Sequence, residues 1–254
     1  MAAFVDHPVV LFLVLLVLFI AAAAIGALTQ RRLLILRDED RDDFNVVQGA
    51  TLTLLALLIG FSLSMAVNRY DQRKNLEENE ANAIGTEYAR ADLADPPVST
   101  QIKDALAHFT QLRLAHFRTR DPEEIARLDR DTAQSESQLW SLATQVGKDK
   151  PNPIGATVVT GMNDVLNAQD YSEAALINRI PVGTWVLMIA IGLVGCAVQG
   201  YGAKGSLSRS LIIAILPVTI ALSLALIADI DSPRGGMIHV EPQNLARLLQ
   251  SLQR

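Results

Sequence analysis

Seven charged residues mark the borders of long uncharged segments in this sequence, and ion pairing or ion binding is the chemistry that they would carry. This set, the ionic cluster, consists of Arg69, Asp71, Arg73, Arg179, Asp229, Asp231 and Arg234. If the uncharged segments cross a membrane, all seven emerge on the same side. Unpaired charges near hydrocarbon are costly. We therefore expect an arginine of the cluster, Arg69 or Arg179, to pair with one of its C-terminal aspartates.

The ionic cluster has two interpretations. It is either an ion gateway or sensor at the membrane face, or a salt-bridge lock that fixes the membrane helices together. The lock is the simpler of the two, because charged groups at a membrane border are normally paired for stability. Residue types and spacing leave both interpretations open.

The uncharged segments themselves predict the fold class. Each has the roughly 17 to 25 residues that a helix needs to cross about 30 Å of hydrocarbon. They are Val9–Leu28, Val46–Val67, Pro181–Ala203 and Leu211–Ala228. We expect the first to be a retained helix and not a cleaved signal, because Met1–Val10 has no Lys or Arg and the apolar run is long. The chain is thus predicted to be an all-α, four-pass membrane protein with its helices in two hairpins.

A polar middle separates the two pairs of segments and is predicted to form a soluble helical bundle. Its expected helices are Ser99–Arg118, Pro122–Val146 and Pro153–Asn178. The predicted division is 1–67, first hairpin; 68–180, soluble domain; 181–229, second hairpin; and 230–254, a tail ending in a short amphipathic helix from about Pro242.

The second membrane helix is predicted to continue beyond the bilayer. From Val46 the sequence reaches Asp95 without a proline, so one helix of almost fifty residues can leave the membrane and enter water. Small polar residues recur along it at intervals of three, four or seven: Asn68, Asn75, Asn79, Asn82 and Thr86. This spacing indicates either a polar seam around a wet axis or a plain solvated helix face.

Several function classes are disfavoured by composition and motifs. The net charge is −5 and no basic stripe is present, so we expect no nucleic-acid partner. The single Cys196 excludes an internal disulfide and a cysteine metal cluster. His108 and His116 stand two turns apart without an obvious third ligand, and we interpret them as surface or packing residues. With no catalytic motif either, we expect no enzyme activity, no metal and no cofactor.

Membrane orientation is left open by the charges. With four spans, the amino terminus, the polar middle and the carboxyl terminus share one side, and the two short loops share the other. Lys and Arg are nearly balanced between the sides, although the uncharged first tail favours cytoplasmic short loops.

Two blocks of sequence resemble a known family. Gly60–Arg73 (GFSLSMAVNRYDQR) with Glu80–Thr86 (EANAIGT), and Ala228–Gly236 (ADIDSPRGG), are similar to the bestrophin-like domain family of bacterial membrane proteins. The resemblance extends over about 46–95 and 180–249. It implies a multi-pass protein of the bacterial inner membrane.

Gly60–Lys74 also resembles the true bestrophins, which are pentameric anion channels with a cytosolic helical portion and a pore-lining second helix. This likeness implies Ser62, Ser64 and Asn68 as pore-facing residues, a pentamer, and small inorganic anions as partners besides the lipid bilayer. It also places the helical middle in the cytosol, against the charge bias. The chain departs from bestrophins in having one large aromatic, Phe61, near the expected neck, no double tryptophan and no calcium clasp.

Two functional hypotheses follow from these features. The first is an oligomeric anion channel with the second helix along its axis. The second is a non-conducting membrane scaffold or sensor whose helical domain binds a protein partner, and it predicts a monomer or a dimer. Fold resemblance alone does not choose between them.

Overall fold

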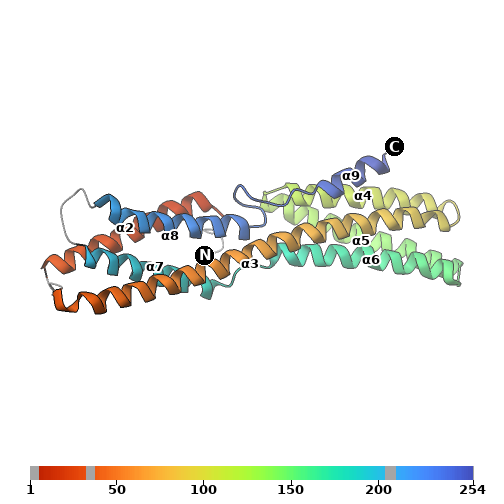
Figure 1. Ribbon diagram of the computed structural model, residues 1–254. Coiled ribbons are helices and arrows are strands. Elements are labelled where there is room, and N and C mark those ends of the chain that lie inside the picture. Colours follow the sequence, from red (N-terminus) through yellow and green to blue (C-terminus); the bar gives the residue numbers. More distant parts are fainter. Residues whose placement is uncertain (1–5, 33–37, 204–209, 254) are drawn as a thin grey trace. The chain divides into compact units, whose positions relative to one another are not determined.

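The computed structural model describes residues 6–32, 38–203 and 210–253, and every regular element among them is helical. The longer helices are α2 (Pro8–Arg32), α3 (Arg41–Arg90), α4 (Val98–Arg118), α5 (Pro122–Asp149), α6 (Pro153–Ile177), α7 (Val182–Gly202), α8 (Ser210–Asp231) and α9 (Gln243–Leu252) (Figure 1). Two short 3₁₀ turns, η1 (Asp38–Asp40) and η2 (Ala91–Leu93), flank α3. The predicted all-α class is confirmed. The membrane orientation considered from the sequence depended on basic residues in the two short loops. Most of these residues lie outside the described residues or have side chains that are not described.

The chain divides into two compact units. The apolar unit comprises residues 1–69 and 179–239, and the polar unit comprises 70–178 and 240–254. The first division falls inside α3, so this helix contributes to both units. The C-terminal helix α9 belongs to the polar unit although it follows the last apolar helix.

Among the described residues, four helical segments are long and apolar enough to cross a membrane. They overlap the four predicted spans and lie on α2, α3, α7 and α8. Within the apolar unit, α2 packs against both α7 and α8, and α8 continues through Pro217. Large side chains such as Phe19, Met188 and Leu224 are fully buried there. Tertiary packing thus joins α2 to helices that are distant in the sequence.

Glycine allows α2 and α7 to approach until their backbones touch. A Cβ at Gly26 would lie 1.9 Å from the Ala197 carbonyl oxygen, and one at Gly200 would lie 1.9 Å from the Ala23 carbonyl oxygen. A Cβ at Gly192 of α7 would meet the Phe19 ring of α2 at 3.0 Å. Close packing through small residues is the usual way in which membrane helices associate.

Helix α3 is continuous over fifty residues. Asp42 and Asp43 stand in its first turn, where carboxylates interact favourably with the helix dipole. The apolar stretch ends at Val67, and the helix goes on without a proline to Arg90. The predicted length is confirmed, and the C-terminal boundary falls at Arg90 and the η2 turn instead of at Asp95.

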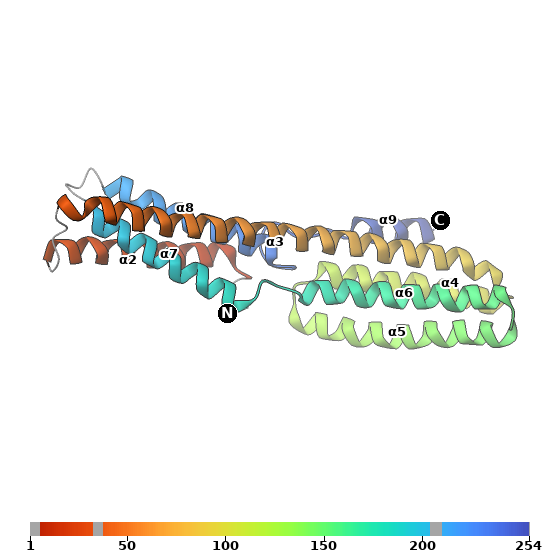
Figure 2. The same cartoon turned by 60° about the horizontal axis from the view of Figure 1, so that its bottom comes forward.

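The polar unit is a helical bundle in which α4, α5 and α6 run side by side (Figure 2). Local signals start two of these helices: Asp121 accepts a hydrogen bond from Glu123 N at 3.0 Å, and Asn152 accepts one from Ile154 N at 2.9 Å. The core contains Ile84, Ile102, Leu106, Phe109, Leu139, Val158, Met162 and Leu245.

A buried carboxylate of the polar unit caps helix α9. Glu77 Oε1 accepts hydrogen bonds from Asn244 N and Leu245 N, both at 2.9 Å, and Oε2 accepts one from Asn244 Nδ2 at 2.7 Å. Glu77 thus caps the N-terminus of α9 from another helix, where negative charge is favoured. The predicted amphipathic helix is present, with Leu245 buried in the core.

We predict that Gly200→Ala destabilises the apolar unit. The added Cβ meets the Ala23 carbonyl, so α2 and α7 must separate, and overpacking of this kind costs about 1–3 kcal/mol. Thermal unfolding of the detergent-solubilised protein measures it. Gly183→Ala on the same helix is the control, because no atom lies within 4 Å of its Cβ position. Equal melting temperatures for the two variants would contradict the close contact.

Candidate functional site

Two buried aspartates end helix α8. Asp229 is 4% exposed and Asp231 is fully buried. The Asp231 carboxylate accepts hydrogen bonds from Ile180 N at 3.1 and 3.2 Å, and its Oδ1 lies 3.5 Å from Arg69 Nη1. Asp231 therefore joins the end of α8 to the segment before α7 and to α3. A backbone donor and an arginine together compensate a carboxylate that is removed from water.

Asp229 stabilises the turn that follows α8. Its carboxylate accepts hydrogen bonds from Met237 N at 2.6 Å and Ile238 N at 3.2 Å. The turn passes through Gly236, whose φ of 72° is unfavourable for a side chain, and a Cβ there would lie 1.7 Å from Asp229 Oδ1. The Asp-x-Asp-Ser-Pro-x-Gly-Gly sequence is thus a compact carboxylate-bound turn.

Arg179 pairs with a residue that the sequence analysis missed. Its Nη1 lies 2.8 Å from Oδ1 of Asp6, which also accepts a hydrogen bond from Ser232 Oγ at 2.8 Å. Asp6 stands alone before the first apolar segment, far from its partners in the sequence. No local pattern indicates such a long-range pair.

The remaining members of the predicted ionic cluster are distributed over both units. Arg234 is half-buried in the turn after α8. Asp71 is exposed and Arg73 is buried, and both belong to the polar unit. The structure brings together Arg69 with Asp231, one of the expected pairings, whereas Arg179 and Asp229 have other partners.

The three residues expected to face a pore do not share one face of α3. Ser62 is 1% exposed, whereas Ser64 and Asn68 are exposed. At about 100° per residue, Ser62 points roughly 160° away from Ser64 around the helix axis. Ser62 therefore belongs to the buried side of α3, and its pore-facing role stays a prediction implied by the resemblance.

An exposed polar stripe continues along α3 on the side of Ser64. Its members recur every three or four residues and all are exposed: Ser64, Asn68, Asp71, Asn75, Asn79, Asn82 and Thr86. The opposite side of the helix contains the buried residues Ser62, Ala66, Arg73, Glu77, Glu80 and Ile84. Within each unit, α3 thus has one packed face and one open face.

The polar unit also buries a carboxylate without a hydrogen bond. Glu87 is fully buried, and neither of its oxygens has a hydrogen-bond partner among the described residues. Burial is the main cause that raises the pKa of Glu87 from 4.5 to about 8. The Arg90 guanidinium, whose Nη1 lies 3.9 Å from Glu87 Oε2, opposes this rise, and the Asp164 carboxylate adds to it. Glu87 lies about five and a half turns beyond Val67, outside the apolar stretch.

The sequence matches a family over most of its length. The Bestrophin-like domain covers residues 16–245. The chain belongs to the bestrophin-like domain family. None of the curated proteins matches it.

Solved structures resemble this bestrophin-like chain in fold. A bacterial bestrophin homolog from Klebsiella pneumoniae carrying a tyrosine-to-alanine mutation has a TM-score of 0.70 at 14% identity, covering 95% of this chain and 97% of that chain. A form with a leucine-to-threonine mutation has a TM-score of 0.70 at 15% identity, covering 97% and 98%. A structure described as a membrane protein with a proline-to-alanine mutation matches with 0.70 at 15%, covering 95% and 97%. Together with the apolar helices, the family indicates a membrane protein with a channel-like fold.

We predict that Asp231→Asn destabilises the bestrophin-like chain. The amide keeps the shape but loses the charge that Arg69 and Ile180 N share, which costs about 1–3 kcal/mol. This corresponds to a melting temperature lower by roughly 3–10 °C in detergent. Asp71→Asn, at an exposed aspartate, is the matched control. Unchanged stability and oligomer size for Asp231→Asn would contradict a structural role of the pair.

Glu87 should make stability pH-dependent. Because its folded-state pKa of about 8 exceeds the ordinary 4.5, the folded state holds the extra proton between these values. Stability therefore falls as pH rises from about 5 to 8, by up to about 1.4 kcal/mol per pH unit, and levels off above. Glu87→Gln should remove this slope and stabilise the protein at pH 9. Parallel pH profiles of melting temperature for the two proteins would exclude the buried acid as the cause.

Proposed function

We propose that this protein is an oligomeric ion channel for small anions, and not an enzyme, with the exposed polar stripe of α3 lining its axis. The observation that carries the proposal is the open face of α3. Ser64, inside the apolar stretch, and Asn68, directly after it, are exposed on this face. In a membrane helix, polar side chains normally face a partner helix or water instead of lipid.

The rest of α3 supports the same arrangement. Beyond Val67 the stripe continues with Asn75, Asn79, Asn82 and Thr86, while the opposite face is buried in its own chain. Copies of α3 placed around a common axis would give a continuous path of amide and hydroxyl groups. Such groups solvate an ion through dipoles without trapping it, as conduction requires.

The anion preference comes from the bestrophin resemblance. The open face also carries Asp71, whose carboxylate opposes anion entry by Coulomb repulsion. Anion and cation flux are therefore measured separately. The inner membrane as location, a pentamer and a cytosolic polar unit belong to the same proposal.

A liposome flux assay tests the channel. We expect vesicles with purified, folded protein to lose a chloride gradient much faster than protein-free vesicles do. They should lose a sodium gradient much more slowly than the chloride gradient. Flux of sodium alone would contradict the anion preference. If neither ion crosses and the protein is a monomer or dimer, the scaffold or sensor hypothesis takes the place of the channel.

Asn68→Leu should lower chloride flux through the same vesicles. The substitution places an apolar side chain on the open face at the end of the apolar stretch, where it removes an ion-solvating amide. Asn167→Leu is the control, because Asn167 is an exposed asparagine on α6, off the stripe. Equal chloride flux in both variants would remove Asn68 from the conducting path.

A further inference from the structure

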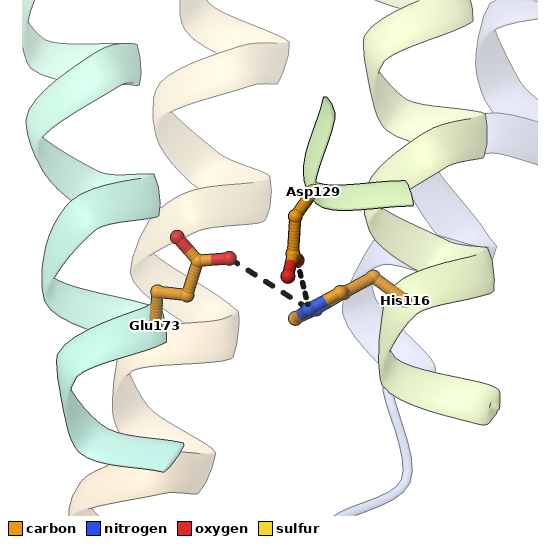
Figure 3. A group of neighbouring side chains, drawn as sticks. All are labelled: His116, Asp129 and Glu173. Carbon is orange, nitrogen blue, oxygen red and sulfur yellow. Dashed lines mark ion pairs between the residues drawn. The ribbon is translucent and has the colours of Figure 1, made fainter. Parts of the chain in front are cut away.

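Three helices of the polar unit direct one potential metal ligand each to a common point. Figure 3 shows His116 of α4, Asp129 of α5 and Glu173 of α6 turned toward one another. His116 Nε2 lies 3.0 Å from Asp129 Oδ1 and 3.7 Å from Glu173 Oε1. The three ligand atoms all lie within 4.8 Å of one another.

These distances suit a divalent transition ion. Zinc binds imidazole nitrogen and carboxylate oxygen at about 2.0–2.2 Å, so tetrahedral ligands stand roughly 3.4 Å apart. The observed separations bracket this value, and small side-chain rotations bring all three atoms into range. The imidazole favours zinc and its neighbours over calcium or magnesium, which prefer oxygen.

The cluster combines a rigid base with an open side. The His116 side chain is 3% exposed, whereas those of Asp129 and Glu173 are 50% and 33% exposed. A hydrated ion can reach the carboxylates from solvent while the buried imidazole stays fixed. The remaining coordination positions are then available to water.

Negative charge is in excess around this point. Arg113 Nη1 lies 3.4 Å from Glu173 Oε1, and the same guanidinium donates to Glu80 from Nε at 2.5 Å and from Nη2 at 3.5 Å. The carboxylates of Asp170 and Glu173 lie near Glu136. Burial is the main cause that raises the pKa of Glu136, and repulsion from these two carboxylates is the next. A divalent cation would offset this repulsion more fully than Arg113 alone does.

A neighbouring buried amide orients Glu173. Gln169 is 3% exposed, and its Nε2 donates a hydrogen bond to Glu173 Oε2 at 2.8 Å, leaving Oε1 toward His116 and Arg113. Gln169 Oε1 is itself buried without a hydrogen-bond partner within the described chain. Metal-ligating carboxylates are commonly held by such second partners.

We propose that His116, Asp129 and Glu173 bind one zinc-like divalent ion per chain and that this ion ties α4, α5 and α6 together. Sequence motifs do not indicate this site, because its three ligands come from three separate helices. The competing interpretation is a metal-free cluster in which protonated His116 pairs with both carboxylates. The two interpretations differ in whether zinc binds with defined stoichiometry.

Zinc titration of the tag-free, chelator-treated full-length protein in detergent, in competition with a chromophoric chelator, tests the site. We expect one ion per chain, with affinity lowered about tenfold or more in His116→Asn and in Asp129→Asn. His108→Asn is the matched control, because His108 is exposed on the same helix, and it should bind as the natural chain does. Cobalt should give a visible absorption band that Asp129→Asn removes.

Three results would overturn the proposal: no saturable zinc binding, unchanged binding in Asp129→Asn and Glu173→Gln, or loss of binding in His108→Asn. If His116→Asn fails to fold, the two carboxylate variants decide the question, because both side chains are partly exposed. The test is independent of ion flux, so a non-conducting protein that binds zinc at this point would leave the proposal intact.

Discussion

The buried carboxylate of Asp231 is the interaction on which the apolar unit most depends. It ends α8, accepts the backbone N–H of Ile180 before α7 begins, and lies beside Arg69 of α3. A buried charge is tolerated only where donors surround it. The position of Asp231 therefore requires three distant chain segments to meet at one place. The turn that Asp229 and Gly236 form directly afterwards leads the chain from the apolar unit to α9.

We interpret the two aspartates that end α8 as structural groups more than as groups for ion passage. Asp229 and Asp231 are occupied by backbone donors, so neither is free to bind a passing ion. The exposed polar groups lie instead on α3, along the face that begins at Ser64. In our account the aspartates hold the scaffold, and the open face of α3 contacts the ion.

Local patterns in the sequence are sufficient to predict the helices. They are insufficient to predict which side chains meet across the fold. Apolar length predicts the spans, and the absence of proline predicts the continuous α3. Asp121 and Asn152 start their helices as local capping predicts. The pair of Arg179 with Asp6 and the approach of His116 to Asp129 and Glu173 depend on tertiary packing. The resemblance placed Ser62, Ser64 and Asn68 together, although a motif carried over from relatives has no information on which face of this helix is buried, and Ser62 lies on the buried face.

Membership of the bestrophin-like family does not by itself determine function, since one fold supports many activities. The proposed channel depends on how the chains assemble. The open face of α3 acquires a role only if several copies surround one axis. Native mass spectrometry of the purified full-length protein tests this condition most directly. We predict a closed homo-oligomer, with five chains as the expected number. A stable monomer or dimer, folded and retaining its lipids, would contradict it.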